Sequence, residues 1–246
     1  MRLQERVIIV TGGAQGLGRT YAARLVGEGA QVVIADVNGA LAASTADEIG
    51  ALAVQTDVAN RSSVQAMIET TVREFGRVDV LVNNAALFGP LEYQPIEGIS
   101  VELWDRVMAV NVRGVFLCCQ AVIAVMKRQG SGKIINIASG TLLSAPANFV
   151  HYITSKGAVF AMTRALAREI GPFGITVNTL SPGLTLTDAV GLHHAPEHIE
   201  RSRSSRALAR DQVPSDLEGA LVFLASPDSD FMTGQMLVVN GGAQFW

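Results

Sequence analysis

Four polar residues have the types and spacing needed to move a proton to or from an alcohol oxygen: Asn111, Ser139, Tyr152 and Lys156. They follow a glycine-rich segment, Thr11–Gly18, with the sequence Thr-Gly-Gly-Ala-Gln-Gly-Leu-Gly. A backbone turn of this composition can approach the pyrophosphate of a dinucleotide closely. Together, the two groups predict hydride transfer between a nicotinamide cofactor and an alcohol or ketone.

Tyr152 and Lys156 are four residues apart in a predicted helix, so their side chains share one helix face. A free tyrosine has a pKa of about 10, which is too high for an efficient base at neutral pH. A nearby ammonium and the positive charge of a nicotinamide would both lower that pKa. We therefore expect Tyr152 to be the general acid/base, with Lys156 lowering its pKa and holding the nicotinamide ribose.

Ser139 follows the apolar run Ile134–Ile137 and is expected to bind the substrate oxygen and stabilise its developing charge. Asn111 lies inside a predicted helix, where asparagine has a low propensity. Our hypothesis for Asn111 is that it positions a water that relays protons to Lys156. A Tyr-x-x-x-Lys spacing alone is common on helix surfaces, so the interpretation depends on the whole set and the glycine turn.

The elements that must position these residues alternate along the chain. Short β-branched runs predict strands buried on both faces of a parallel sheet, at Val7–Val10, Gln31–Ala35, Ala53–Gln55, Val78–Val82, Ile134–Ile137, Ile175–Asn178 and Met236–Val239. Amphipathic segments between them predict helices at 17–28, 39–49, 61–75, 101–129, 152–170 and 214–225. The alternation predicts one α/β domain over 1–246, a Rossmann-type doubly wound parallel sheet of about seven strands with helices on both faces.

The first strand and helix are expected to bind the cofactor through the turn between them. Its expected contacts are Gly12, Gln15, Gly16, Leu17 and Gly18. The helix N-terminus offers free N–H groups and a partial positive charge to a pyrophosphate. Asp36 ends the second strand at about the spacing expected of a carboxylate that binds the adenosine ribose. Its charge would repel a 2′-phosphate, and Gln15 and Val37 add no positive charge, so NAD is favoured over NADP.

Charge and composition exclude several classes of function. The chain of 246 residues has a formal net charge of −3, which gives no electrostatic argument for nucleic acid. We expect no membrane span and no signal peptide, and therefore a cytoplasmic protein. The adjacent Cys118 and Cys119 suit a reduced core helix. A basic cluster is interpreted as a solvated helix face or lid; it comprises Arg201, Arg203, Arg206 and Arg210.

Two long irregular segments, Leu87–Ser100 and Pro182–Pro214, follow predicted strands and are expected near the ligand. Residues of about 184–213 would form a mobile substrate lid. The expected pocket wall is mostly apolar, without a fixed charge, and comprises Thr141, Leu142, Phe149 and Leu184. We therefore expect a small hydrophobic secondary alcohol or ketone as substrate.

Histidines cluster in the second irregular segment, at His193, His194 and His198. No acidic or cysteine ligand is clearly placed beside them, so no metal site is expected. His151 adjoins Tyr152 but is expected on another helix face, without a catalytic role. The C-terminal Phe245 and Trp246 are hypothesised to pack at a subunit contact.

The chain resembles the short-chain dehydrogenase/reductase family in its form of roughly 250 residues. The resemblance extends from Arg6 to Gly242. It is carried by the glycine turn, Asp57-Val58, Asn83-Asn84-Ala85, Asn111, Ser139, Tyr152-x-x-x-Lys156, Pro182-Gly183 with Thr187, and Thr233-Gly234-Gln235 through Asn240-Gly241-Gly242.

The resemblance implies further cofactor contacts and an assembly. Asp57 and Val58 would contact adenine, and Asn84 and Ala85 would border the cofactor. Contacts near the nicotinamide are implied for Pro182, Gly183, Thr185 and Thr187. The family also implies a homotetramer, with the helices of Asn111 and Tyr152 and the last strand at subunit contacts.

The sequence departs from the family pattern at three places. Ala86 replaces a usual glycine, Thr185 replaces an aliphatic residue, and the loop at 88–100 is a few residues longer. Short stretches such as His151–Lys156 and Thr163–Ala167 resemble NAD-dependent dehydrogenases of aryl or cyclic alcohols.

Three other functions remain open. They are an NADPH-dependent 3-oxoacyl thioester reductase of the same family, a non-catalytic nucleotide-binding regulatory protein and, less favoured because the chain is short, a sugar-nucleotide epimerase.

Overall fold

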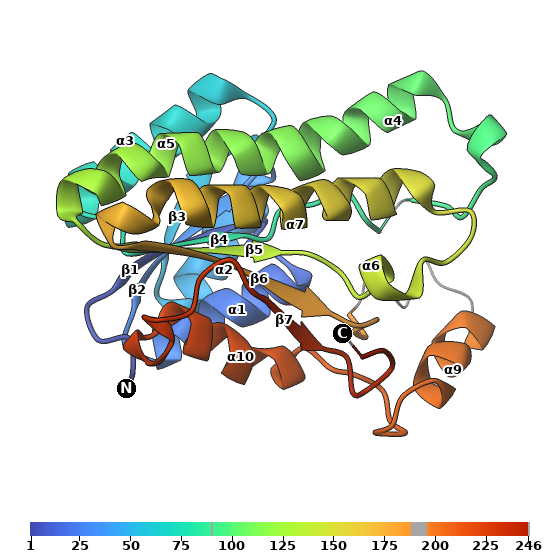
Figure 1. Ribbon diagram of the computed structural model, residues 1–246. Coiled ribbons are helices and arrows are strands. Elements are labelled where there is room, and N and C mark those ends of the chain that lie inside the picture. Colours follow the sequence, from blue (N-terminus) through green and yellow to red (C-terminus); the bar gives the residue numbers. More distant parts are fainter. Residues whose placement is uncertain (90, 188–195, 246) are drawn as a thin grey trace.

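The β-branched runs form seven strands that are all parallel, in the order β3-β2-β1-β4-β5-β6-β7 (Figure 1). The computed structural model describes residues 1–89, 91–187 and 196–245. The strands are β1 (Val7–Thr11), β2 (Gln31–Asp36), β3 (Leu52–Gln55), β4 (Val80–Asn83), β5 (Gly132–Ile137), β6 (Ile175–Pro182) and β7 (Met236–Val239). The strand order reverses between β1 and β4, so a crevice opens at their carboxyl ends. The predicted fold class is confirmed.

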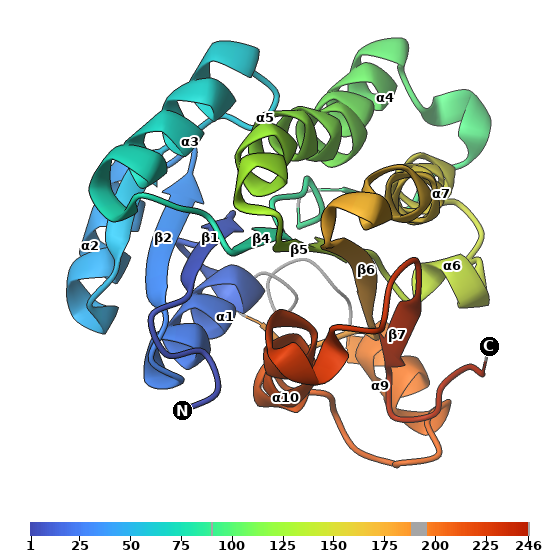
Figure 2. The same cartoon turned by 60° about the vertical axis from the view of Figure 1, so that its left-hand side comes forward.

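Helices cover both faces of the sheet (Figure 2). Their bounds are α1 (Gly16–Gly27), α2 (Gly39–Ile49), α3 (Arg61–Phe75), α4 (Val101–Met108), α5 (Gly114–Gln129), α6 (Thr141–Ser144), α7 (Val150–Ile170), α9 (Pro196–Ser204) and α10 (Ser215–Ala225). Buried residues of α1, α2 and α10 share one core cluster, and those of α3, α5 and α7 share another.

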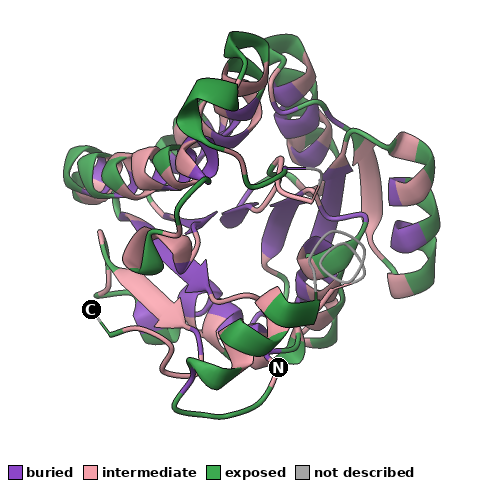
Figure 3. Ribbon diagram, turned by 90° about the vertical axis from the view of Figure 1, so that its right-hand side faces the viewer, coloured by how far each residue is buried: buried purple, intermediate pink, exposed green. Residues whose placement is uncertain are grey.

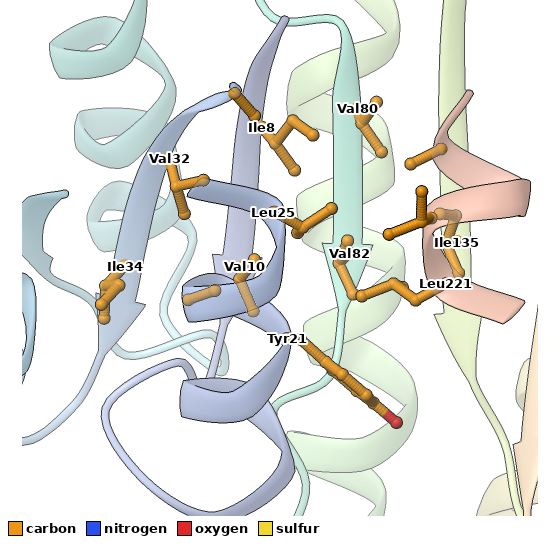
Figure 4. Close-up of a cluster of buried hydrophobic side chains, with 14 of the residues drawn as sticks. Ile8, Val10, Tyr21, Leu25, Val32, Ile34, Val80, Val82, Ile135 and Leu221 are labelled. Atoms are coloured by element: carbon orange, nitrogen blue, oxygen red, sulfur yellow. The ribbon is translucent and has the colours of Figure 1, made fainter. Parts of the chain in front are cut away.

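Alternate residues of each central strand supply the two cores, as the two-residue repeat of a strand requires. Ile8 and Val10 of β1 face the cluster that contains Tyr21 and Leu25 of α1, whereas Ile9 belongs to the opposite cluster (Figure 4). Buried residues follow the sheet and the inner helix faces, while exposed residues lie on the outer helix faces (Figure 3). The sheet is therefore a rigid support for whatever its carboxyl ends carry.

Three of the differences from the sequence prediction concern elements near the site. The predicted helix over 101–129 contains a π-helical turn at Ala109–Arg113, which carries Asn111. β6 continues four residues beyond the predicted Ile175–Asn178 and ends at Pro182, where Gly183 begins the next loop. The irregular segment after β6 contains the helix α9, which begins with Pro196 and Glu197, residues that suit the first turn of a helix. This helix is polar, so no apolar periodicity in the sequence indicated it.

The helical stretch Val101–Gln129 has an 18-residue window with a mean hydropathy of 1.8, enough to cross a membrane by length and composition alone. The expectation of no membrane span stays a prediction, because length and composition alone do not decide whether a helix crosses a membrane. Core helices of soluble proteins pass the same test. Here Cys118 and Val122 of α5 lie in one cluster with Leu81 of β4 and Ile134 of β5, so much of the apolar surface packs on the sheet.

Candidate active site

The turn between β1 and α1 requires glycine at position 18. A Cβ atom on Gly18 would lie 1.9 Å from the carbonyl oxygen of Gly12. The side chain of Asn84, at the end of β4, donates to the carbonyls of Thr11 and Gly12, both at 3.0 Å. The turn is thus fixed against the neighbouring strand, at the point where the strand order reverses.

The N-terminus of α1 is open to a ligand. Its N-cap residue, Gln15, makes no capping hydrogen bond with its side chain. In contrast, Asn38, Asn60 and Ser100 cap α2, α3 and α4. Gly16 has a positive φ of 54°, and a Cβ atom there would point into open space. Free N–H groups beside open space fit the pyrophosphate of a dinucleotide.

One large pocket, with a volume of about 870 Å³, joins this turn to Ser139, Tyr152 and Lys156. All the predicted cofactor-binding residues line it: Gly12, Gln15, Gly16, Leu17, Gly18, Asp36, Val37, Asp57, Val58, Asn84, Ala85, Tyr152, Lys156, Pro182, Gly183, Thr185 and Thr187. The carboxyl ends of β1, β2, β3, β4 and β6 and the first turns of α7 bring them together from distant parts of the sequence.

Asp36 lies at the end of the pocket next to the glycine turn. Its carboxylate accepts hydrogen bonds from the backbone N–H groups of Ala14, at 3.1 Å, and Asn38, at 3.0 Å. The positively charged residues that line the pocket are Lys156, Arg201 and Arg206, which come from α7 and the region of α9. Among the described lining residues, none with a positive charge comes from the elements around Asp36.

Tyr152 and Lys156 lie in the first two turns of α7, and both are almost fully buried at 6% and 4% exposure. The ammonium of Lys156 donates to the carbonyl oxygen of Ile137 at the end of β5, at 2.8 Å. It lies 5.7 Å from the centroid of the Tyr152 ring. The predicted pair is therefore brought together, with the amine held at the sheet and the phenol above it.

Burial acts on the two groups in opposite directions. It lowers the pKa of Lys156 to about 8, because the charged amine is removed from water. It raises the pKa of Tyr152, and the hydroxyl of Ser139 only partly opposes that rise. Desolvation by burial is the largest effect of the protein on the pKa of Tyr152. The lowering expected from Lys156 together with the nicotinamide charge stays a prediction.

Ser139 lies beyond the end of β5 and lines the pocket with Tyr152. Its hydroxyl oxygen accepts hydrogen bonds from the backbone N–H of Thr141, at 3.2 Å, and from the Thr141 hydroxyl, at 3.0 Å. These bonds leave the hydroxyl hydrogen of Ser139 able to donate. Ser139 can therefore bind a substrate oxygen beside Tyr152, as predicted.

Asn111 does not line the pocket, and its side chain is committed to protein partners. Its amide oxygen accepts from the N–H of Leu87, while its amide nitrogen donates to the Leu87 carbonyl and the Ser155 hydroxyl. Ser155 in turn donates to the carbonyl of Tyr152 at 2.7 Å. The side chain of Asn111 thus ties the loop after β4 to the catalytic helix. A water relay to Lys156 stays a prediction and would use the main chain of this π-helical turn.

Two of the four predicted substrate-pocket residues line the pocket, namely Thr141 and Leu184. Phe149 does not, because it is 1% exposed and packs in a core cluster with Leu91 and Val107. Leu142 is also absent from the wall. It lies toward α7, where a Cβ atom on Gly157 would meet it at 3.7 Å.

Aromatic residues of the loop after β4 take the place of Phe149. Phe88 packs on Tyr152 with ring centroids 5.1 Å apart, and Tyr93 stacks on Phe149 at 4.4 Å. Both Phe88 and Tyr93 line the pocket. The sequence predicts parts of this loop near the ligand, but its spacing does not distinguish Phe88 and Tyr93 from the other residues of the loop.

The basic cluster is only partly the solvated face that was predicted. Arg203 pairs with Glu200 and Asp211, and Arg210 pairs with Asp216. Arg206, in contrast, is 7% exposed, and both Arg206 and Arg201 line the pocket. The expectation of a wall without fixed charge was therefore wrong, since the described residues after β6 bring both guanidinium groups to the pocket wall, with Arg206 nearly buried and Arg201 exposed.

The histidines occupy different environments. His193 and His194 lie outside the described residues, while His198 of α9 lines the pocket and contacts the hydroxyl of Tyr93 at 3.5 Å. His151 is fully buried and packs edge-on against Phe149. Within the described ranges, no group of three or more histidine, cysteine or acidic residues could hold a metal ion.

A parallel sheet with a glycine turn, a carboxylate at the end of β2 and a Tyr-Lys pair at its carboxyl ends is typical of a Rossmann-type nicotinamide oxidoreductase. The chain belongs to the short-chain dehydrogenase/reductase family. A model of that family, described as Enoyl-(Acyl carrier protein) reductase, matches residues 12–244.

Named relatives cover nearly the whole chain. The hydroxy(phenyl)methylsuccinyl-CoA dehydrogenase subunit BbsD of Thauera aromatica is 40% identical over 98% of each chain. Cyclopentanol dehydrogenase of Comamonas sp. is 36% identical, also over 98% of each. A crystal structure of 3-ketoacyl-(acyl-carrier-protein) reductase from Brucella melitensis, complexed with NADH, is 36% identical with a TM-score of 0.93, covering 99% of this chain and 100% of that one. These relatives are oxidoreductases that act on CH–OH groups.

The buried Lys156 gives a testable dependence of stability on pH. Its pKa is about 8 in the folded protein and 10.5 for the exposed amine, so the unfolded chain binds more protons between these values. As the pH is raised from about 8 to 10.5, the free energy of unfolding of the wild type, relative to that of Lys156→Met, should therefore increase by about 1 kcal/mol per pH unit. This gain should be lost when the pH is lowered again through the same range. Chemical denaturation at several pH values measures it.

Lys127→Met provides the control, because Lys127 is exposed on α5. Its pH profile should stay parallel to that of the wild type. Parallel profiles for Lys156→Met as well would contradict the assignment of a buried, strongly desolvated amine.

Proposed function

We propose that the protein is an NAD-dependent dehydrogenase that transfers hydride between NAD and a secondary alcohol or its ketone. The observation that carries this proposal is that one pocket joins the open N-terminus of α1 and Asp36 to Ser139, Tyr152 and Lys156. The dinucleotide site and the proton-transfer site are therefore continuous.

The cofactor end supports NAD over NADP. The Asp36 carboxylate would accept hydrogen bonds from the ribose hydroxyls, because each oxygen has a further lone pair beyond its backbone partner. A 2′-phosphate would meet a like charge there, with no positively charged lining residue from the adjacent elements. The NADH complex of the Brucella melitensis relative accords with a nicotinamide cofactor.

The proton-transfer residues have separate tasks. Bound NAD would supply the hydride acceptor and a positive charge beside the pocket wall. Tyr152 would remove the hydroxyl proton of the alcohol as the phenolate, with Ser139 donating to the same oxygen. Lys156 has three N–H donors and uses one on Ile137, so two remain for the nicotinamide ribose and the phenolate. A pKa of about 8 lets it exchange a proton near neutral pH.

The substrate end receives an apolar group beside the reacting carbon. Phe88 and Tyr93 form an aromatic wall next to Tyr152, and Leu184 faces the same pocket. Relatives named for an aryl succinyl-CoA compound and for cyclopentanol accord with a carbinol that carries an apolar substituent. The nearest alternative is a reductase of 3-oxoacyl thioesters, which the similarity to a ketoacyl reductase favours. A non-catalytic nucleotide-binding role is less favoured because the catalytic residues are assembled.

We also propose a cytoplasmic homotetramer. Phe116 of α5 is an exposed aromatic residue, and β7 is at one end of the sheet with its outer edge unpaired within the described chain. Both features suit the subunit contacts expected for this family.

The assembly can be tested by sedimentation. The chain has a mass of 26.0 kDa, and the wild type should sediment with about four times that mass. Phe116→Glu should shift it toward smaller species, since a buried unpaired charge opposes association. A wild-type protein that remains a monomer at all concentrations would contradict the proposed assembly.

Removal of the Tyr152 hydroxyl tests the proton-transfer step. Tyr152→Phe should lower kcat by about 10²-fold or more, the low end for general acid/base catalysis, while NAD binding persists. Tyr21→Phe is a matched control, because Tyr21 is buried in the core with a hydroxyl that has no partner. It should retain activity. Near-normal turnover by Tyr152→Phe would contradict the assignment.

The cofactor preference can be tested at Asp36. Asp36→Ala should raise the NADP/NAD ratio of kcat/KM by about 10-fold or more, because a like-charge contact with the 2′-phosphate is removed. Asp47→Ala removes an exposed carboxylate from α2 and should leave the ratio unchanged. An unchanged ratio for Asp36→Ala would mean that another group reads the ribose.

A further inference from the structure

We propose that the natural substrate carries an anionic group in addition to its carbinol, and that Arg201 of α9 binds this group at the pocket wall. This inference rests on the proposed dehydrogenase function and deepens it. It replaces the neutral substrate that the sequence alone suggested with an acidic one, such as a hydroxy acid or a phosphate-bearing thioester.

The two ends of the pocket differ in charge. Among the described lining residues, the carboxylates are Asp36 and Asp57, both at the dinucleotide end. Arg201 and Arg206 line the other end, together with the uncharged polar residues Ser202 and Ser205. A pocket end with two guanidinium groups and no carboxylate among these residues attracts an anion and repels a cation.

The other carboxylates of this region are already paired. Glu200 and Asp211 pair with Arg203, and Asp216 pairs with Arg210. In the described part of the chain, neither Arg201 nor Arg206 takes part in an ion pair. Two arginines of this segment, Arg203 and Arg210, thus pair with its carboxylates. The other two, Arg201 and Arg206, line the pocket.

Arg206 gives the wall a fixed positive charge. It is nearly buried and donates to the carbonyls of Arg210 and Leu184 and to the hydroxyl of Ser202, while its Nε has no partner. A guanidinium keeps its charge inside proteins, and leaving it without a carboxylate costs free energy. A substrate anion nearby would offset that cost. Arg206 holds the backbone of Leu184 and is a positioning residue, whereas Arg201 is exposed and free to contact the anion.

The aromatic residues set the order of groups along the substrate. Phe88 packs on Tyr152, so an apolar group lies beside the reacting carbon. Tyr93, on the same wall, contacts His198 with ring centroids 5.3 Å apart. His198 is three residues before Arg201, which places both on neighbouring positions of α9. The expected sequence is therefore carbinol, apolar group and then anion.

Two alcohols of nearly the same shape separate the contribution of the charge. They are 1-(4-methylphenyl)ethanol and 4-(1-hydroxyethyl)benzoate, in which a carboxylate replaces a methyl group and lies beyond the ring from the carbinol. The coenzyme A thioester of the second alcohol distinguishes a phosphate-bearing carrier from a free carboxylate. The measured quantity is the ratio of kcat/KM for the anionic alcohol to that for the neutral one, with NAD saturating.

The wild type should prefer one of the two anionic alcohols by about 10-fold or more, as a charge-assisted contact at a partly desolvated site allows. Arg201→Gln should reduce this preference by about 10-fold. Arg203→Gln is the matched control: it removes the same charge from the same helix but from a residue that does not line the pocket. Its ratio should stay near that of the wild type.

Equal use of the neutral and both anionic alcohols by the wild type would overturn the proposal. So would an equal loss of preference in Arg201→Gln and Arg203→Gln, which would indicate a general effect of charge or of helix stability. A preference for the thioester alone would assign the anion to the carrier phosphates, and a preference for the free acid would assign it to the carboxylate.

A binding measurement separates failure of this proposal from failure of the proposed function. The same alcohols are titrated calorimetrically into protein saturated with NADH, where no hydride can pass to an alcohol. Tighter binding of an anionic alcohol that Arg201→Gln abolishes would support the anion site even without turnover. Binding that ignores the charge would overturn it, whatever the activity.

Discussion

The structure depends on a positive charge that is buried where the sheet meets α7. The ammonium of Lys156 has left water and bonds to the carbonyl of Ile137, at the end of β5. Burial of an amine is costly, so the groups around it must be fixed and dipolar, and its pKa falls to about 8. The same desolvation keeps the neighbouring Tyr152 protonated. The pair is therefore ready for a ligand that brings hydroxyl groups and positive charge.

The position of α7 follows from buried polar contacts with the sheet. Asn136 of β5 accepts from Asn83 of β4 and donates to Thr163 of α7, and Thr179 of β6 also donates to Thr163. Asn111 adds a bond from the π-helical turn to the same helix. Each contact would leave a buried polar group unpaired if the helix moved. The phenol of Tyr152 and the amine of Lys156 are thus held at the carboxyl ends of the strands, where the glycine turn and Asp36 also lie.

Local patterns were enough to predict the sheet, most of its helices, and the glycine turn with Asp36, whereas the family resemblance supplied Asp57 and Asn84 at the dinucleotide end. Alternating strands and helices bring strand ends together whatever the loops do, so Gly16, Asp36 and Lys156 could be placed from spacing. The residues that line the substrate end of the pocket could not be predicted in this way. Whether Phe149 or Phe88 faces the pocket depends on how two loops pack, and the inward turn of Arg206 depends on contacts with Leu184. Such contacts between distant segments leave no periodic signal in the sequence.

In the proposed reaction, hydride is transferred inside this pocket from a carbinol carbon to NAD. The most direct measurement is the mass of the NADH formed from secondary alcohols, neutral and anionic, that carry deuterium on the carbinol carbon. The reduced cofactor should contain that deuterium, and NADP should support the reaction much less well than NAD. Absence of reduced cofactor with every alcohol, or reduced cofactor without the label, would contradict it.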